Sequence, residues 1–375
     1  MTAPSVDLSP KRASYDPADF VVPSGREELW RFTPMRRMRG LHQQSDATGG
    51  VRYVVGEAAD AHIAVVGRDD PLLAMAAAPT DRVAAQAWAN FDKAAVISVA
   101  PNEQVAEPIM ASIHAEGEPH SFGQVVIDCG SHSSSTTVVE HRGAGAYAGG
   151  ITIRVADGAR ATVAVLQQMD EDGVLVGNVQ AELGRDASLR CVAVTLGGDL
   201  VRLATNVTYN APGGSVELLG AFFTAGGSHQ EHRLFVDHSV PDCSSEVVYK
   251  GALAGDKAHS VWVGDVLIRA AATGTSTYET NRNLVLTDGA RADSVPNLEI
   301  ETGEVVGAGH AAATGRFDDE QLFYLQSRGI SADEARRLVV RGFFADIVRR
   351  IGVAEVEAPL LAAVDKELAS IGASS

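Results

Sequence analysis

The stretch GGITIRVADGARATVAVLQQ, residues 149–168, decides the fold. Two segments rich in β-branched residues flank a short turn of small and polar residues, ADGARA at 156–161. β-branched residues favour extended strands, and a glycine inside a polar cluster favours a tight turn. The stretch therefore predicts a strand, a tight turn and a second strand, with no helix between them.

The same pattern, in which short β-branched segments alternate with turns of small or polar residues, continues from about residue 93 to residue 312. The turns LGRDAS (183–188) and NAPGGS (210–215) follow the first turn at intervals of about 27 residues, and TDGARA (287–292) restates it almost letter for letter. A period of 20–50 residues with one strand–turn signature is typical of a solenoid. Further strand-like segments are AAVISVA (94–100), GQVVIDC (123–129), ASLRCVAV (187–194), SVELLGAFF (215–223), EVVYKGAL (246–253), HSVWVGDVLI (259–268) and NRNLVL (281–286).

We therefore expect a mainly β protein with a right-handed parallel β-helix, or solenoid, as its core. A coil of this kind buries small side chains in layers, which suits a chain with 37 glycines and only 6% aromatic residues. A β-sandwich or jelly roll is the competing prediction. It would show cleaner alternation and the hairpin dipeptide Asn-Gly, which the chain lacks.

Helical regions are expected on both sides of this core. Residues 1–92 are predicted to be mostly helical, with two short helical pieces around Pro34 and another helix over 74–88. The core is expected to span 93–312. From 313 to 375 the pattern predicts three amphipathic helices that cap one end of the coil or offer a docking surface.

Composition and charge exclude several classes of protein. The formal charge of −17 argues against a nucleic-acid binder and against anionic membrane surfaces. The sequence contains no signal-peptide pattern and no apolar run of about 18 residues, so we expect a cytoplasmic protein. The three cysteines, Cys129, Cys191 and Cys243, are widely spaced and form no CxxC motif, which predicts small core residues rather than a disulfide framework.

Common catalytic motifs are missing from the sequence. There is no P-loop, no GxSxG and no HExxH. A β-helix enzyme such as a polysaccharide lyase or an acyltransferase is one alternative function, although it would need a groove rich in aromatic residues or carboxylates. Another alternative is a cupin-like metal protein that uses His229, His232 and His238, with His259 further along. The interpretation without a metal is that these imidazoles form hydrogen bonds between adjacent coils.

His310 stands at the point where the small, apolar end of the β-region gives way to a helical pattern. A histidine in the core would need hydrogen-bond partners, whereas a histidine on the surface would be unremarkable. The residues alone leave both interpretations open.

Three segments resemble the SufB/SufD family of iron–sulfur cluster assembly scaffold proteins. They are HRLFVDHSVPDCSSEVVYKGAL, NRNLVLTDGARADSVPNLEIETGEV and HAAATGRFDDEQLFYLQSRGISADEARRLVVRGFF. The N-terminal GREELWRFTP makes the chain most similar to the SufD branch. The resemblance implies a right-handed β-helix between helical regions, in agreement with the pattern of strands and turns.

The resemblance also implies a function, which is that of a non-catalytic scaffold. Such a chain pairs with SufB through the β-helix cores and binds the SufC ATPase through its C-terminal helical region, which fits the missing P-loop. The isolated chain is then expected to carry no cofactor and is open to pairing with itself. An iron–sulfur cluster forms transiently with SufB, and the sequence leaves open whether reduced flavin joins the complex.

By motif, His310 corresponds to a SufD histidine near the SufB interface, where it serves as a candidate iron or cluster ligand. A neutral imidazole is a suitable iron ligand beside a partner's thiolate. Two positions depart from the pattern of the family. Ala308 stands where members often have cysteine, and Asn281 stands where SufB carries its assembly cysteine. This chain is therefore not expected to supply a thiolate there.

Overall fold

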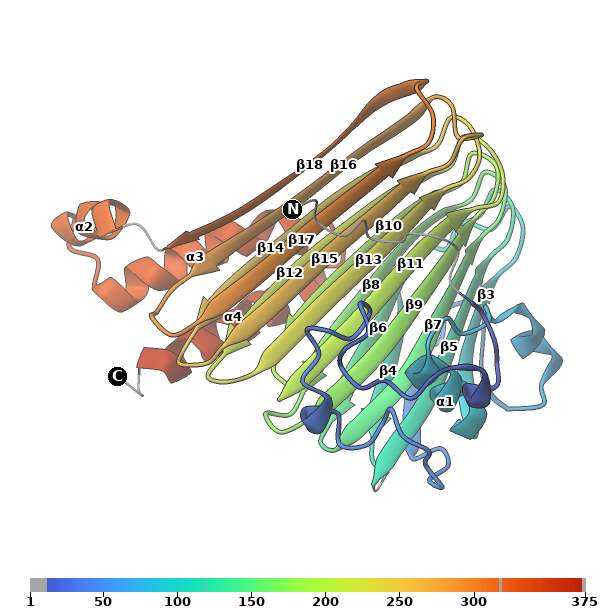
Figure 1. Ribbon diagram of the computed structural model, residues 1–375, viewed down its shortest axis with the longest axis horizontal. Coiled ribbons are helices and arrows are strands. Elements are labelled where there is room, and N and C mark those ends of the chain that lie inside the picture. The colour runs from blue at the N-terminus through green and yellow to red at the C-terminus, as the bar shows by residue number, and fades with distance from the viewer. Residues whose placement is uncertain (1–11, 118, 317–318, 373–375) are drawn as a thin grey trace.

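The computed structural model describes residues 12–117, 119–316 and 319–372. Its core consists of two long sheets whose strands alternate along the chain (Figure 1). Sheet A has the order β1 (Val51–Val55), β4 (Ile109–Ala115), β6 (Ser134–Gly143), β8 (Arg160–Met169), β10 (Ser188–Leu196), β12 (Ser215–Ala225), β14 (Ser244–Ala254), β16 (Thr275–Val285) and β18 (Val305–Arg316). Sheet B has the order β17 (Arg291–Ile300), β15 (His259–Ile268), β13 (His229–His238), β11 (Leu200–Tyr209), β9 (Val174–Leu183), β7 (Ala146–Val155), β5 (His120–Cys129), β3 (Lys93–Val99) and β2 (His62–Gly67).

From β3 onward the paired strands run parallel and in register, as expected for a β-solenoid of about eight turns. The two ends of the coil differ. At the first coil, β1 and β2 pair antiparallel with β4 and β3 and cover the strand edges. At the last coil, β17 and β18 end their sheets, and no strand in the described part of the chain pairs with their outer edges. The predicted solenoid is confirmed, with one capped end and one open end.

The tight turns explain how the sequence closes each coil. Gly158, in the quoted ADGARA turn between β7 and β8, takes a left-handed backbone that glycine tolerates best. The next turn of the same kind has Asp186 in that conformation, and short polar residues also tolerate it. The second DGARA, at 288–292, joins β16 to β17 and therefore leads from sheet A to sheet B, the reverse of the first. The two identical segments thus lie on opposite edges of the coil.

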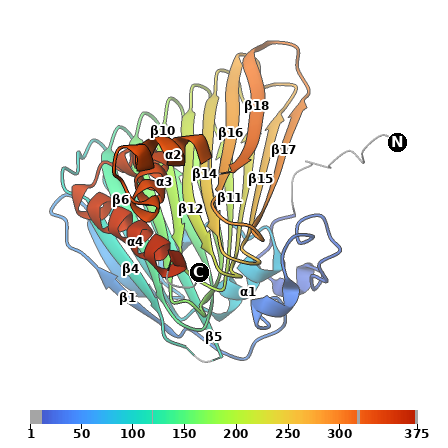
Figure 2. The ribbon, with the colours of Figure 1, turned by 90° about the vertical axis from the view of Figure 1, so that its left-hand side faces the viewer.

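Helices cover part of the outer face of sheet A. α3 (Ala332–Arg349) and α4 (Ala354–Gly372) lie across its strands, as Figure 2 shows, and α2 (Asp319–Ser327) precedes them. Phe344 and Val364 pack with Leu219 and Phe223 in one buried apolar cluster. None of the helices in the described residues is long and apolar enough to cross a membrane.

The region before residue 93 is a correction to the predicted, mostly helical segment. Its described part contains two strands, β1 and β2, because the first coil offers unpaired backbone groups that these strands satisfy. The remainder packs on the outer face of sheet B as η1 (Pro17–Asp19), η2 (Met35–Met38), η3 (Pro71–Met75) and α1 (Arg82–Asn90). At the other boundary, β18 continues to Arg316, beyond the expected end of the core at residue 312.

The interior of the coil is packed so closely that several glycines have no room for a side chain. A Cβ on Gly220, on the inner face of β12, would come within 2.1 Å of the Tyr249 ring. We expect Gly220→Ala to lower the free energy of unfolding by about 1–3 kcal/mol, because overpacking forces neighbouring side chains out of place.

The measurement is chemical denaturation followed by circular dichroism. Gly307→Ala is the matched control, because nothing lies within 4 Å of a Cβ on Gly307, and it should change stability by less than about 0.5 kcal/mol. Equal stability of the two variants would contradict the packing described for this coil.

Candidate functional site

His310 lies near the middle of β18, on the last coil, with an exposed side chain. It is in register with Glu279 on β16, and Gly309 is in register with Tyr278. Side chains alternate between the faces of a strand, and Tyr278 is exposed whereas Glu279 is buried. His310 therefore belongs to the inner face of the solenoid, at the end that no further coil covers.

Glu279 lies one strand behind His310, at a strand spacing of about 4.8 Å. The side chain is 1% exposed, and neither carboxyl oxygen has a hydrogen-bond partner among the described residues. A Cβ on Gly264 would lie 2.7 Å from Glu279 Oε1, so this glycine makes room for the carboxyl group. Burial, together with the charge of Asp265, raises the pKa of Glu279 to about 8.

Polar groups continue along the same inner face. Asn281 is fully buried, and its Oδ1 accepts hydrogen bonds from Ser294 Oγ at 2.6 Å and Asn283 Nδ2 at 2.8 Å. Asn283 also donates to Thr314 on β18 at 3.3 Å. Ala308, on the His310 side, is in register with buried Thr277 and adds only a methyl group. The end of the coil thus carries an imidazole, a carboxyl group and amides, but no thiol.

The three cysteines are buried and free, as the sequence predicted, and none of them lies on β16, β17 or β18. Burial raises the pKa of Cys129 to about 11 and that of Cys191 to about 12. It also raises the pKa of Cys243. All three remain protonated thiols at neutral pH, and a protonated thiol is a poor nucleophile and a poor metal ligand.

The histidines of β13 do not form the cupin-like centre that was considered as an alternative. His232 and His238 face the interior, where they stack on Phe222 and Tyr209. His229 lies an odd number of residues from His232 and therefore faces the outside of sheet B. Within the described residues, no three His, Cys, Asp or Glu side chains are grouped to hold a metal ion.

Burial lowers the pKa of both inner histidines, so they stay neutral. His232 bonds to Thr195 at 2.9 Å, and His238 bonds to Ser245 at 2.9 Å. These bonds agree with the interpretation of the imidazoles as hydrogen-bonded parts of the coil.

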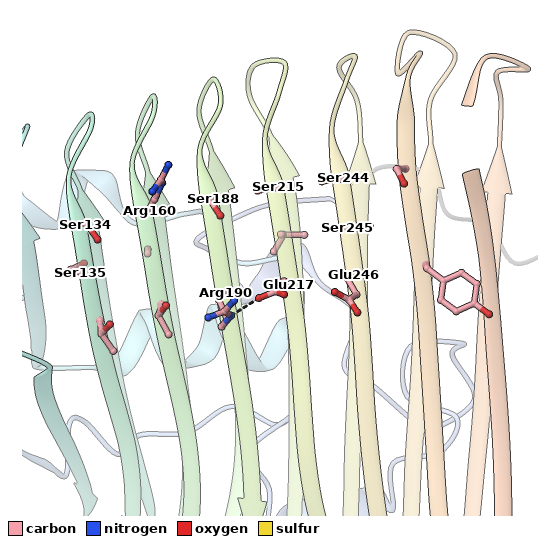
Figure 3. Close-up of a pocket in the computed structure, with 16 residues that line it drawn as sticks. Ser134, Ser135, Arg160, Ser188, Arg190, Ser215, Glu217, Ser244, Ser245 and Glu246 are labelled. Carbon is pink, nitrogen blue, oxygen red and sulfur yellow. Dashed lines mark hydrogen bonds and ion pairs between the residues drawn. The ribbon is translucent and has the colours of Figure 1, made fainter. Parts of the chain in front are cut away.

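A groove of about 650 Å³ runs across the outer face of sheet A (Figure 3). Its floor has two rows of side chains in register, mostly hydroxyls in the first row and charged or hydroxyl groups in the second. Arg190 and Glu217 form an ion pair near its centre, and the described lining contains no histidine. The first row consists of Ser134, Arg160, Ser188, Ser215, Ser244 and Ser276. The second row consists of Thr136, Thr162, Arg190, Glu217, Glu246 and Tyr278.

This groove does not favour the alternative of a β-helix enzyme. Tyr278 is its one aromatic side chain among the described lining residues, and Glu217 is already paired with Arg190. A serine nucleophile would also need an adjacent base, and no lining histidine provides one.

Comparison with known proteins agrees with the architecture. Residues 112–343 match the model of the SufBD core domain of SUF-system iron–sulfur cluster assembly. An iron–sulfur cluster assembly SufBD family protein of Mycobacterium tuberculosis is 52% identical over 364 residues, which cover 95% of this chain and 92% of that protein.

Similarity to proteins named SufD is lower. The SufD protein of Bacillus subtilis is 27% identical over 289 residues, or 73% of this chain and 64% of that protein. The Escherichia coli SufD is 28% identical over 186 residues, or 50% of this chain and 44% of that protein. The family model covers more than half of this chain. The chain therefore belongs to the SufBD family of iron–sulfur cluster assembly proteins.

Proposed function

We propose that this protein is a SufD-like scaffold subunit that pairs with SufB, binds the SufC ATPase and supports de novo cluster assembly in the cytoplasm. Membership of the SufBD family supports the general role. The observation that carries the specific role is the position of His310, exposed on the inner face of the uncapped coil. A ligand in this position is accessible to a partner that docks at the end of the solenoid.

The open end is suited to pairing with a second β-helix. The outer edge of β18 presents backbone groups without a strand partner in the described chain, and such edges readily accept another strand. Val306 on β18 is 77% exposed and Ile300 at the end of β17 is 44% exposed. Burying these apolar side chains against SufB would stabilise the pair.

The chemistry proposed for this end is the temporary holding of iron or of a nascent cluster, which is the cargo of the assembly. His310 offers an imidazole nitrogen ligand, and Glu279 offers an oxygen ligand one strand behind it. The inner face here lacks a thiol, because Ala308 and Asn281 occupy the two candidate positions. Sulfur ligands would therefore come from SufB, and the complete site would exist only in the heterodimer.

For SufC, we propose a docking surface on α2 and the neighbouring part of α3. Phe323 and Tyr324 on α2 are 72% and 55% exposed, and Leu338 on α3 is 46% exposed. α3 and α4 use other residues to cover sheet A, so deleting the helical region would also expose the apolar face of the sheet. Single substitutions on α2 and α3 are therefore a cleaner test than truncation.

We expect His310→Ala to leave folding and SufB binding unchanged but to reduce cluster formation. The exposed imidazole makes little contact with the core, so stability should change by less than about 0.5 kcal/mol. Loss of a ligand should lower cluster yield about tenfold or more. The measurement is anaerobic reconstitution of the complex, followed by its iron and sulfide content and visible absorption.

His62→Ala is the matched control for this experiment, because His62 is also exposed but lies on β2 at the capped end. Its complex should assemble clusters like the wild type. Wild-type cluster yield from the His310→Ala complex would refute the ligand role.

We also expect Phe323→Asp and Leu338→Asp to prevent co-purification of SufC while SufB still binds. A carboxylate in the centre of an apolar contact is desolvated without a partner, which weakens binding strongly. Val65→Asp, at a 41% exposed position on β2, is the control. SufC bound equally well by all three variants would exclude α2 and α3 as the docking surface.

A further inference from the structure

Two histidines face each other on the outer face of sheet B. His310, in contrast, lies on the inner face of sheet A. His229 begins β13 and His259 begins β15, and the two are in register on adjacent strands. Their Nδ1 atoms are 3.2 Å apart, and the rings meet edge to face. His229 is 2% exposed and the His259 side chain is 26% exposed, so the pair lies just beneath the surface.

The other nitrogen of each ring lies next to a carboxylate. His229 Nε2 lies 3.4 Å from Glu231 Oε2, and His259 Nε2 lies 2.7 Å from Asp293 Oδ2. A carboxylate only accepts hydrogen bonds, so each ring must donate from Nε2. A neutral imidazole carries one N–H, so both Nδ1 atoms are then left with lone pairs, 3.2 Å apart.

The three contacts, from Glu231 through the two rings to Asp293, need three protons, whereas two neutral imidazoles supply two. One contact therefore lacks its proton, and an additional proton or a metal ion bound to both Nδ1 atoms would complete the arrangement. The same arrangement, with an imidazole between a metal and a carboxylate, orients histidine ligands in many metal sites.

The distance between the two nitrogens suits a metal ion. Two nitrogens at 2.0–2.1 Å from a tetrahedral Zn²⁺ lie about 3.3 Å apart, close to the observed 3.2 Å.

Both carboxylates are held in place from the other side. Glu231 accepts a hydrogen bond from Thr33 Oγ1 at 2.7 Å and lies near the guanidinium groups of Arg202 and Arg233.

Asp293, on β17, accepts a hydrogen bond from Arg291 at 2.9 Å. Both acceptors are thus ionised carboxylates and are oriented toward the histidines.

We propose that His229 and His259 bind a divalent first-row transition metal ion through their Nδ1 atoms, with Glu231 and Asp293 orienting the two rings. The protein supplies two nitrogen ligands, since no third His, Cys, Asp or Glu ligand joins them in the described residues. Water fills the other positions on the partly exposed His259 side, so binding is reversible. Imidazole nitrogens suit Zn²⁺, Fe²⁺ and Cu²⁺.

The test is titration of the chelator-treated full chain with Zn²⁺ at neutral pH, followed by isothermal calorimetry. We expect one ion per chain, no binding by His259→Ala, and affinity weakened about 10–100-fold by Asp293→Asn, which keeps the shape of the side chain. Co²⁺ absorption spectra should show nitrogen ligation that His259→Ala removes. Circular dichroism of the metal-free variants checks that they fold.

Two controls separate this site from other histidines. His62→Ala, on exposed β2, and His310→Ala should both bind Zn²⁺ like the wild type. Since the second control lacks the proposed cluster ligand, its result does not depend on the function proposed above. Failure of the wild-type chain to bind Zn²⁺, or unchanged binding by folded His259→Ala, would overturn the proposal. The two Nδ1 atoms would then share a proton instead of a metal ion.

Discussion

The structure depends on in-register hydrogen bonding between parallel strands of successive coils. Each strand satisfies its backbone groups with the strand before it and the strand after it, so the fold propagates but does not terminate itself. The chain solves the problem at one end with the antiparallel strands β1 and β2. At the other end β17 and β18 are left without such a cover in the described residues. The position of the proposed functional site follows from this asymmetry.

Much of the solenoid could be predicted because its local signals repeat. Turns such as ADGARA combine small residues with a position that requires left-handed backbone, and they recur at nearly constant spacing. The N-terminal strands Val51–Val55 and His62–Gly67 are also rich in β-branched residues, but they lie outside the repeating pattern of turns, and their antiparallel pairing with the first coil depends on the fold. The two DGARA segments show the limit of pattern matching. Identical residues make similar tight turns on opposite edges of the coil.

The residues proposed to be functional differ in the same way in how far the sequence could identify them. His310 could be identified from its motif, whereas the motif gives no reason to select Glu279, which lies 31 positions earlier in the chain. Their proximity depends on the register of β16 and β18, which includes an irregularity at Thr275 and Ser276. The separation of His229 from His232 could have been found from sequence, because an odd spacing on a strand places two side chains on opposite faces. The contact of His229 with His259 again required the register.

β17, the last strand of sheet B, carries polar side chains on both its outer and its inner face. Asp293 points outward and bonds to His259, whereas the next residue, Ser294, points inward and bonds to Asn281 behind the His310 face. A partner that docks on the open end must contact β17 and β18, the strands that end the sheets. If docking shifts β17, it alters the carboxylate that orients His259 and the polar groups of the inner face together. Thermodynamic linkage then requires metal binding at the histidine pair to change affinity for the partner by the same factor. The terminal coil is therefore the place where assembly and metal binding would influence each other.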